Sequence, residues 1–259
     1  FGSVAKYIAT STLEAGLDVK SMAETSTKVF ILEVMGRHAG WIAAASCLAA
    51  TKAGDPPHII LLPEVPFEKS KFITQVKQTV KEQGYCVIVA SEGTQTKNGK
   101  FLADSGLTDA FGHKQLGGVA PVLAGMISKI GLKNHWAVAD YLQRSARHIA
   151  SKTDLDQAYA VGEHAVKLAI SGKTALMPII KRTSDSPYKW KIATAPLKNV
   201  ANIEKTMPKK FISKNGFEIT QAGKTYLSPL IKGEAPIKYV NGLPDVAELK
   251  KIKVKKKLN

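Results

Sequence analysis

The sequence has 259 residues, enough for one large domain or two smaller ones with a substantial buried core. Apolar residues make up 44% of it and charged residues 22%, as in ordinary soluble globular proteins, which excludes disorder of the whole chain. The formal net charge is +16, so nucleic acid, anionic membranes and phosphorylated ligands all have to be considered as partners.

The excess of positive charge does not come from one segment. Six lysines lie between residues 250 and 257, and without them the net charge falls from +16 to +10. We therefore expect most of the excess to be solvated lysine, with a smaller group of cations at a phosphate site. Aromatic and basic residues do not interleave as in RNA-binding motifs, which argues against a nucleic-acid partner.

Other features indicate a cytoplasmic protein with no membrane partner. No run reaches the ~18 apolar residues of a membrane span, and the first residues lack the basic and apolar regions of a signal peptide. Cys47 and Cys86 lie in apolar runs, far apart in the sequence. Two such thiols are typical of a reducing compartment, and they are too few for a disulfide framework or a cysteine zinc site.

Apolar runs alternate with segments of helical period along the first part of the chain. In chain order the pattern predicts helix 1–18, strand 28–36, helix 41–51, strand 58–64, helix 67–83 and strand 85–90. The strands are continuous apolar runs, as in sheets buried on both faces. This alternation predicts an α/β fold with a parallel, Rossmann-like sheet in a three-layer αβα arrangement.

The remaining segments are less uniform. The pattern predicts a long polar loop at 92–113, helix 114–130, strand 135–141, helix 154–171, and strands 174–182 and 190–201. The last two strands are joined by the turn sequence TSDSPY, which indicates a hairpin. After Pro208 the regularity fades, and the C-terminal residues are expected to form a surface tail.

Three predicted strands end next to charged side chains. Arg37 follows Met35 and Gly36, Glu92 follows the third strand, and Arg144 follows the fourth. Ligands of open α/β sheets gather beyond the carboxyl ends of the strands. Arginine offers a planar fork to phosphate and a carboxylate accepts from hydroxyls, so these groups suit a phosphorylated polyol. The alternative is that Arg37 and Glu92 only form an ion pair with each other.

Other kinds of site find little support. No two of the six histidines have the spacing of metal ligands on a helix, and no cysteine lies near them, so we predict no metal ligands in this chain. Walker A, GxSxG and HExxH motifs are absent from the sequence. The catalytic residues remain unknown at this stage.

Three motifs carry a resemblance to a family. EVMGRHAGWIAAAS at 33–46 resembles the sugar-phosphate-binding motif of the phosphofructokinases, SEG at 91–93 their second substrate-binding segment, and YLQR at 141–144 their third. Their order and approximate spacing also match. The stretches DAFGHKQLGGVAPVLAGMI and LSPLIKGEAPIKYVNGLPD are most similar to the bacterial pyrophosphate-dependent branch.

The resemblance implies a set of residues around fructose 6-phosphate. Glu92 would accept hydrogen bonds from the sugar hydroxyls, and Arg144 would bind near the phosphate together with Tyr141. The implied substrate-binding residues are Met35, Gly36, Arg37, Glu92, Tyr141 and Arg144.

The family also binds the 6-phosphate with two arginines from a neighbouring subunit. The matching positions are Lys28, which keeps the charge without the fork, and His135, which is mostly neutral at pH 7. Whether these two residues bind phosphate across subunits stays open. The resemblance implies a homo-oligomer, either a dimer or a tetramer.

The family's donor-binding motifs do not occur in the sequence. The phosphofructokinases have a Gly-Gly-Asp loop for the phosphoryl donor and Mg²⁺, and a Thr-x-Asp-x-Asp segment whose first aspartate is the catalytic base. Neither occurs in the 259 residues. The expected aspartate and the Mg²⁺ ligands would therefore lie upstream of Phe1, and the chain would carry a partial phosphofructokinase fold.

The resemblance also implies an organisation and an activity. Residues 1–182 would form the fructose 6-phosphate-binding α/β domain, and residues 183–259 a hairpin and C-terminal extension packed on the amino-terminal half. The activity would be that of a pyrophosphate-dependent 6-phosphofructokinase in glycolysis, inactive as this chain alone. The alternatives are an ATP-dependent phosphofructokinase and a non-catalytic sugar-phosphate-binding subunit.

Overall fold

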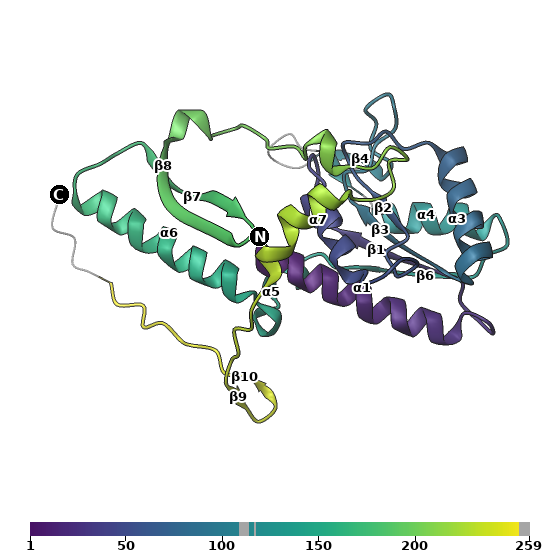
Figure 1. Ribbon diagram of the computed structural model, residues 1–259, viewed down its shortest axis with the longest axis horizontal. Helices are drawn as coiled ribbons and strands as arrows, with labels where there is room; N and C mark the ends of the chain where they lie inside the picture. The colour runs from purple at the N-terminus through teal and green to yellow at the C-terminus, as the bar shows by residue number, and fades with distance from the viewer. Residues whose placement is uncertain (109–113, 117, 254–259) are drawn as a thin grey trace.

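A parallel four-stranded sheet forms the core of the larger part of the molecule, at the right in Figure 1. The computed structural model describes residues 1–108, 114–116 and 118–253. The strand order is β2-β3-β1-β6, and all neighbours run parallel. The strands are β1 (Val29–Val34), β2 (Ile59–Leu61), β3 (Cys86–Ser91) and β6 (Asn134–Val138). The four apolar runs of the sequence thus form one sheet, which confirms the predicted α/β class.

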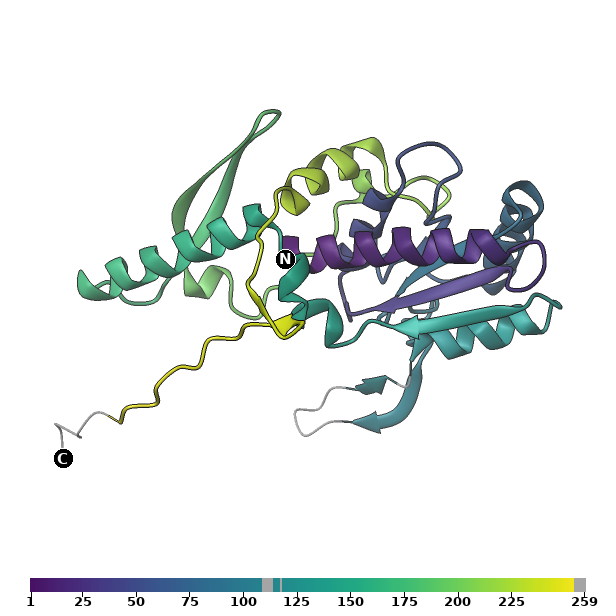
Figure 2. The ribbon, with the colours of Figure 1, turned by 90° about the horizontal axis from the view of Figure 1, so that it is seen from below.

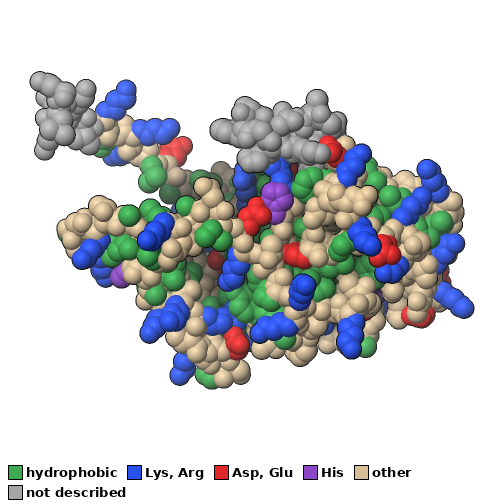
Figure 3. Space-filling view, turned by 90° about the horizontal axis from the view of Figure 1, so that it is seen from above, with side chains coloured by type: hydrophobic (Ala, Val, Ile, Leu, Met, Phe, Trp, Pro, Cys, Tyr) green, Lys and Arg blue, Asp and Glu red, His purple; other side chains and the backbone are tan. Residues whose placement is uncertain are grey.

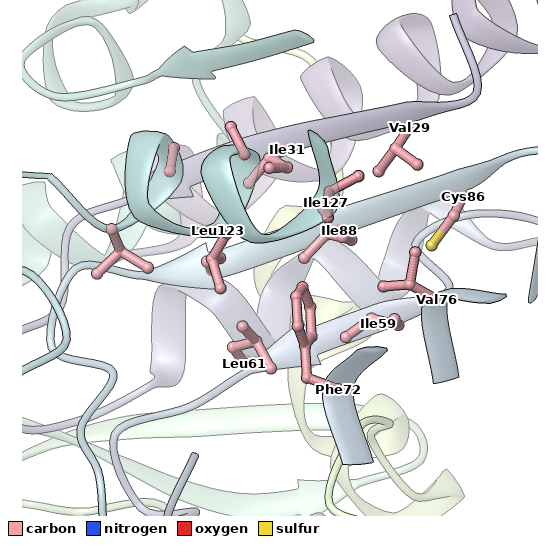
Figure 4. Close-up of a cluster of buried hydrophobic side chains, with 14 of the residues drawn as sticks. Val29, Ile31, Ile59, Leu61, Phe72, Val76, Cys86, Ile88, Leu123 and Ile127 are labelled. Carbon is pink, nitrogen blue, oxygen red and sulfur yellow. The ribbon is translucent and has the colours of Figure 1, made fainter. Parts of the chain in front are cut away.

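One face of the sheet is covered by two helices, α3 (Lys69–Gln83) and α4 (Val119–Ser128). Figure 4 shows Phe72 of α3 and Leu123 of α4 in contact with strand side chains that include Ile31 and Ile88. These side chains are fully buried. Burying a side chain of this size contributes about 1.5–3 kcal/mol, so this cluster is a main source of stability.

The other face is covered by α1 (Gly2–Met22) and α2 (Trp41–Ala45). Because strand residues alternate between faces, Leu32 and Val34 of β1 point to this side, where they share a cluster with Ile8 of α1. Figure 2 shows α1 and α4 on opposite sides of the sheet. The three-layer αβα arrangement is therefore confirmed.

The segment after β3 differs from the predicted loop and helix. Residues Asp104–Thr108 form β4, which pairs antiparallel with β5 (Lys114–Leu116), and α4 begins at Val119 rather than at residue 114. Gly118 has φ of 96°, which lies outside the helical region, and Pro121 fits the first turn of a helix. Residues 109–113 and 117 of the predicted segments lie outside the described residues.

Helix α6 (Lys152–Ile170) and the hairpin of β7 (Leu176–Asp185) and β8 (Tyr188–Pro196) form an arm that extends away from the sheet (Figures 1 and 2). This unit, residues 152–196, is called the arm below. The hairpin confirms the predicted strand pair, and the predicted domain boundary at residue 182 falls inside β7. Large apolar side chains of the arm are exposed: Leu155, Tyr159, Val166, Ile170, Met177 and Ile180.

The segment after Pro208 is more regular than the sequence predicts. It forms η4 (Lys209–Phe211), α7 (Gln221–Leu227) and η5 (Ser228–Ile231). Phe211 and Leu227 are buried in the cluster that also holds Ile8 of α1, so this segment is part of the second helical layer. The expected surface tail begins only after η5, where β9 (Tyr239–Val240) and β10 (Leu243–Pro244) form a short exposed hairpin.

The remaining short helices connect these elements: η1 (Ser46–Ala49), α5 (Leu142–Ser145), η2 (Arg147–Ile149) and η3 (Leu197–Asn199). Within the described ranges, no helix is long and apolar enough to cross a lipid bilayer. Lys and Arg side chains are spread over the face shown in Figure 3 rather than gathered in one patch, as expected for solvated lysine.

Candidate functional site

The ends of three neighbouring strands bring the predicted motifs to one edge of the sheet. In the sheet register Val34 of β1 lies beside Ser91 of β3, and Glu33 of β1 lies beside Val138 of β6. Met35, Glu92 and the residues after β6 therefore lie at the same level, at the carboxyl ends of the strands. Parallel pairing thus assembles the three segments that are far apart in the sequence.

The turn after β1 approaches the turn after β3 very closely. The Gly36 amide donates to Oε1 of Glu92 at 3.1 Å, and the Gly93 amide donates to the Gly36 carbonyl at 3.2 Å. A Cβ atom at position 93 would lie 1.8 Å from the carbonyl oxygen of Arg37. Position 93 must therefore be glycine, because any side chain would push the two turns apart.

Arg37 does not form the ion pair that was the alternative to a ligand site. No salt bridge joins it to Glu92, whose Oε1 accepts from the Gly36 amide instead. Nε of Arg37 is buried and has no hydrogen-bond partner among the described residues. Buried donors are normally hydrogen-bonded, so this one is available to an anionic or hydroxylated ligand at the sheet edge.

The third motif lies in the single turn of α5, after β6. The guanidinium carbon of Arg144 lies 4.4 Å from the centroid of the Tyr141 ring, and both side chains are exposed, Tyr141 by 62%. Gln143 is buried between them, and its Nε2 donates to the Asp140 carbonyl at 2.8 Å. The turn thus presents Tyr141 and Arg144 to solvent while Gln143 anchors it.

Glu33 is a carboxylate at this edge that the sequence analysis did not single out. It is 5% exposed, and its Oε2 accepts from the Ala120 amide at 2.7 Å, at the start of α4. Burial raises the pKa of Glu33 and the nearby charge of Glu92 adds to the rise, while the Ala120 amide opposes it. The sequence contained a signal for this contact, because Glu33 lies inside an apolar strand and a buried charged residue requires a specific partner.

Lys28 and His135 lie at the other end of the strands from the motifs. Lys28 precedes β1, where its Nζ donates to the Ala23 carbonyl, and His135 is exposed near the start of β6. These two residues therefore take no part in the cluster at the carboxyl edge of this chain. Their role across a subunit interface stays a prediction.

The described residues do not fit a magnesium site. Within the described ranges, no three His, Cys, Asp or Glu side chains converge into a group that could hold a metal ion. His38 is exposed, pairs with Glu204 and stacks on Phe101, so it is not directed at a ligand.

Comparison with known proteins agrees with the motifs. The chain is 63% identical over 259 residues to the pyrophosphate–fructose 6-phosphate 1-phosphotransferase of Halomonas elongata, and 57% identical over 261 residues to that of Xanthomonas campestris. Each match covers 100% of this chain and 62% of the relative. The chain thus spans 62% of the length of these relatives.

Solved structures and the family's sequence model give the same result. The crystal structure of a pyrophosphate-dependent phosphofructokinase from Marinobacter aquaeolei matches with a TM-score of 0.89 and 58% identity, covering 100% of this chain and 62% of that one. The one from Nitrosospira multiformis matches with a TM-score of 0.89 and 54% identity, with the same coverage. The sequence model described as Phosphofructokinase matches residues 8–169, more than half of the chain. With its three motifs at the edge of one parallel sheet, the chain belongs to the phosphofructokinase family.

Proposed function

We propose that this chain carries the sugar-phosphate site of a pyrophosphate-dependent 6-phosphofructokinase. The reaction transfers a phosphoryl group from diphosphate to fructose 6-phosphate, giving fructose 1,6-bisphosphate and phosphate in glycolysis. The observation that carries the proposal is the convergence of the three motifs at the carboxyl edge of β1, β3 and β6. The names of the relatives at 57–63% identity support this activity and donor.

The site residues have distinct roles in this proposal. Arg37 lies in a turn held by hydrogen bonds, so its guanidinium is positioned before the ligand arrives, which saves the entropy of ordering it. Glu92 binds the Gly36 amide with Oε1 and has Oε2 for a sugar hydroxyl. Arg144, supported by the Tyr141 ring, supplies positive charge for the phosphate. Met35 and Gly36 bring the turn close to the sugar.

The remaining chemistry belongs to the part of the relatives' length that this chain does not cover. Phosphoryl transfer depends mainly on positioning and electrostatic stabilisation, so both substrates have to be held together. The diphosphate site, the aspartate base and the Mg²⁺ ligands are proposed to lie there. The whole protein is proposed to be a cytoplasmic homo-oligomer, either a dimer or a tetramer.

Residues 1–182 are proposed to form most of the sugar-phosphate domain, to which Phe211 and Leu227 also contribute. The exposed part of residues 183–259 is proposed to pack on the amino-terminal half of the whole protein. Large apolar side chains of the second unit support this packing, because Leu197 and Ile203 are exposed in this chain. Exposed large apolar residues are found on surfaces that another part of a protein covers.

A coupled assay of the full-length protein tests the function. The expected result is formation of fructose 1,6-bisphosphate from fructose 6-phosphate with diphosphate and Mg²⁺, and no formation with ATP. Turnover with ATP alone would favour an ATP-dependent phosphofructokinase. Binding of fructose 6-phosphate without turnover on either donor would favour a non-catalytic sugar-phosphate-binding subunit.

A further inference from the structure

Glu64 lies just after β2, the strand that contributes none of the three motifs. Its Oε1 and Oε2 accept from the Gly40 amide at 3.0 and 3.1 Å, and Oε1 also accepts from the Met207 amide at 2.9 Å. The carboxylate therefore joins two segments of the chain, 24 and 143 residues away. No motif in the sequence includes it.

Gly40 ends the turn that carries Arg37 and is the residue before α2. The turn is thus held at both ends, by Glu92 at Gly36 and by Glu64 at Gly40. The contact leaves no room for a side chain, because a Cβ at position 40 would lie 2.9 Å from Oε2 of Glu64. A carboxylate at the start of a helix also satisfies an amide that the helix itself leaves free.

The second partner of Glu64 connects this turn to the C-terminal part of the chain. Met207 is 3% exposed and belongs to the cluster between the sheet and the second helical layer. Two residues earlier, the Lys205 carbonyl accepts from Nε1 of Trp41 at 2.7 Å, next to Gly40. The start of α2 is therefore held by hydrogen bonds from two segments. Lys205 binds Trp41, and Glu64, which follows β2, binds Gly40.

We propose that Glu64 is a positioning residue for fructose 6-phosphate binding, an inference that rests on the proposed function. It does not touch the sugar. It fixes Gly40, and with it the turn between Gly36 and Gly40, so that the guanidinium of Arg37 has one position relative to Glu92. Without Glu64 the turn keeps Glu92 as its one carboxylate partner of the two. Binding of the sugar then has to order the turn, and this cost weakens the binding.

The test measures binding of fructose 6-phosphate to the full-length protein by isothermal titration calorimetry. Glu64→Ala is expected to raise the Kd for fructose 6-phosphate about tenfold, the usual loss when hydrogen bonds to a charged group disappear. The Kd for diphosphate is expected to change less than twofold. In amide hydrogen exchange, Gly40 and Trp41 should exchange faster in the variant, while the β3 amides should not.

Two further variants keep the test decisive. Glu64→Gln keeps the volume and one acceptor oxygen, so it should fold and weaken sugar binding by a smaller factor than the alanine variant. Glu68→Ala is the matched control, because Glu68 is exposed on the same segment and, among the residues that the structure describes, its side chain pairs with Lys71 alone. It should leave the Kd within twofold of the wild type.

The outcomes separate this inference from the proposed function. A sugar Kd within twofold of the wild type in a folded Glu64→Ala protein overturns the positioning role, and so does an equal loss for sugar and diphosphate. A wild-type protein that binds fructose 6-phosphate but turns over no diphosphate contradicts the proposed function alone. A wild-type protein that does not bind fructose 6-phosphate overturns both.

Discussion

At the scale of single residues, the buried Nε of Arg37 has no partner among the described residues. Such a donor costs free energy that a ligand can recover, so we expect Arg37→Ala to act mainly on the sugar. In the full-length enzyme the KM for fructose 6-phosphate should rise about tenfold to a hundredfold, equivalent to ~1.5–3 kcal/mol. The KM for diphosphate should change much less. Steady-state kinetics with each substrate varied in turn measures both constants.

Arg147→Ala is a suitable control for this variant. Arg147 follows the third motif, is exposed, and donates to the Ala235 carbonyl at 2.7 Å without reaching the sheet edge. Its loss should leave the KM for fructose 6-phosphate unchanged within twofold. If Arg37→Ala also left this KM and the kcat unchanged, the assignment of Arg37 to the sugar site would be wrong.

Glu92 is held by a strand of the core, whereas Glu248 lies in the exposed tail. We expect Glu92→Gln to raise the KM for fructose 6-phosphate about tenfold, because a carboxylate binds hydroxyl donors more strongly than an amide does. The amide oxygen can still accept from Gly36, so the turn should persist. Glu248→Gln should have no effect in the same assay, and equal effects of the two changes would argue against a sugar contact.

The sequence predicted where the candidate site residues lie in the fold, but not the residues that support them; the substrate-binding roles stay a prediction. Arg37, Glu92 and Arg144 follow strands, and their positions could be derived from the strand pattern alone. Glu33 and Glu64 bind backbone amides 87 and 24 residues away, at Ala120 and Gly40. Every residue except proline has a backbone amide, so the sequence does not show which amide a carboxylate binds. The folded structure is needed to identify the pair.

At the scale of elements, the apolar runs predicted the sheet because strands buried on both faces have to be apolar throughout. The hairpin of β4 and β5 was missed because β4, with the sequence DSGLT, is polar and contains glycine. The short helices after Pro208 were missed because segments of three, seven and four residues are too short to show a clear helical period. The segment after Pro208 owes its structure to packing in the cluster that also holds Ile8 of α1.

His58, the residue before β2, binds the neighbouring strand β3 with both its side chain and its backbone. The Val87 amide donates to its Nδ1 at 2.9 Å, and the Val87 carbonyl accepts from the His58 amide. Burial lowers the pKa of His58, so the folded state favours the neutral ring. Between the lowered pKa and about 6.5 the unfolded chain binds more protons, so the free energy of unfolding should rise with pH and level off above 6.5.

His58→Asn should flatten this pH dependence, because asparagine accepts from the Val87 amide and does not titrate. The measurement is urea unfolding between pH 5 and pH 8. The difference in slope between the wild type and the variant should not exceed ~1.4 kcal/mol per pH unit, the limit for one proton. Parallel curves for wild type and His58→Asn would contradict the prediction.

At the scale of the whole molecule, we expect the 259-residue chain alone to transfer no phosphate. It contains neither a Gly-Gly-Asp loop nor a Thr-x-Asp-x-Asp segment. A general base alone contributes about 10²–10⁴-fold to a rate, and positioning of the donor contributes more. A coupled assay with fructose 6-phosphate, Mg²⁺ and either diphosphate or ATP tests this, with the full-length protein as the control. Turnover by the chain alone would mean that the base lies within it.

The arm also determines how the molecule unfolds. It is fastened near the start of α6, where Asp154 accepts from the Ser3 amide at 2.9 Å and Ser151 donates to the Leu230 carbonyl at 2.7 Å. The hairpin has a further attachment, because Arg182 donates to the Tyr226 carbonyl at 2.7 Å. Val166 and Ile170, in the second half of α6, are exposed, so little burial opposes the opening of that half. In the isolated chain, denaturation should therefore proceed in two steps. Amides of α6 after residue 160 should lose hydrogen-exchange protection at lower urea than those of β1 and β3, and a single transition shared by all three would show one cooperative unit instead.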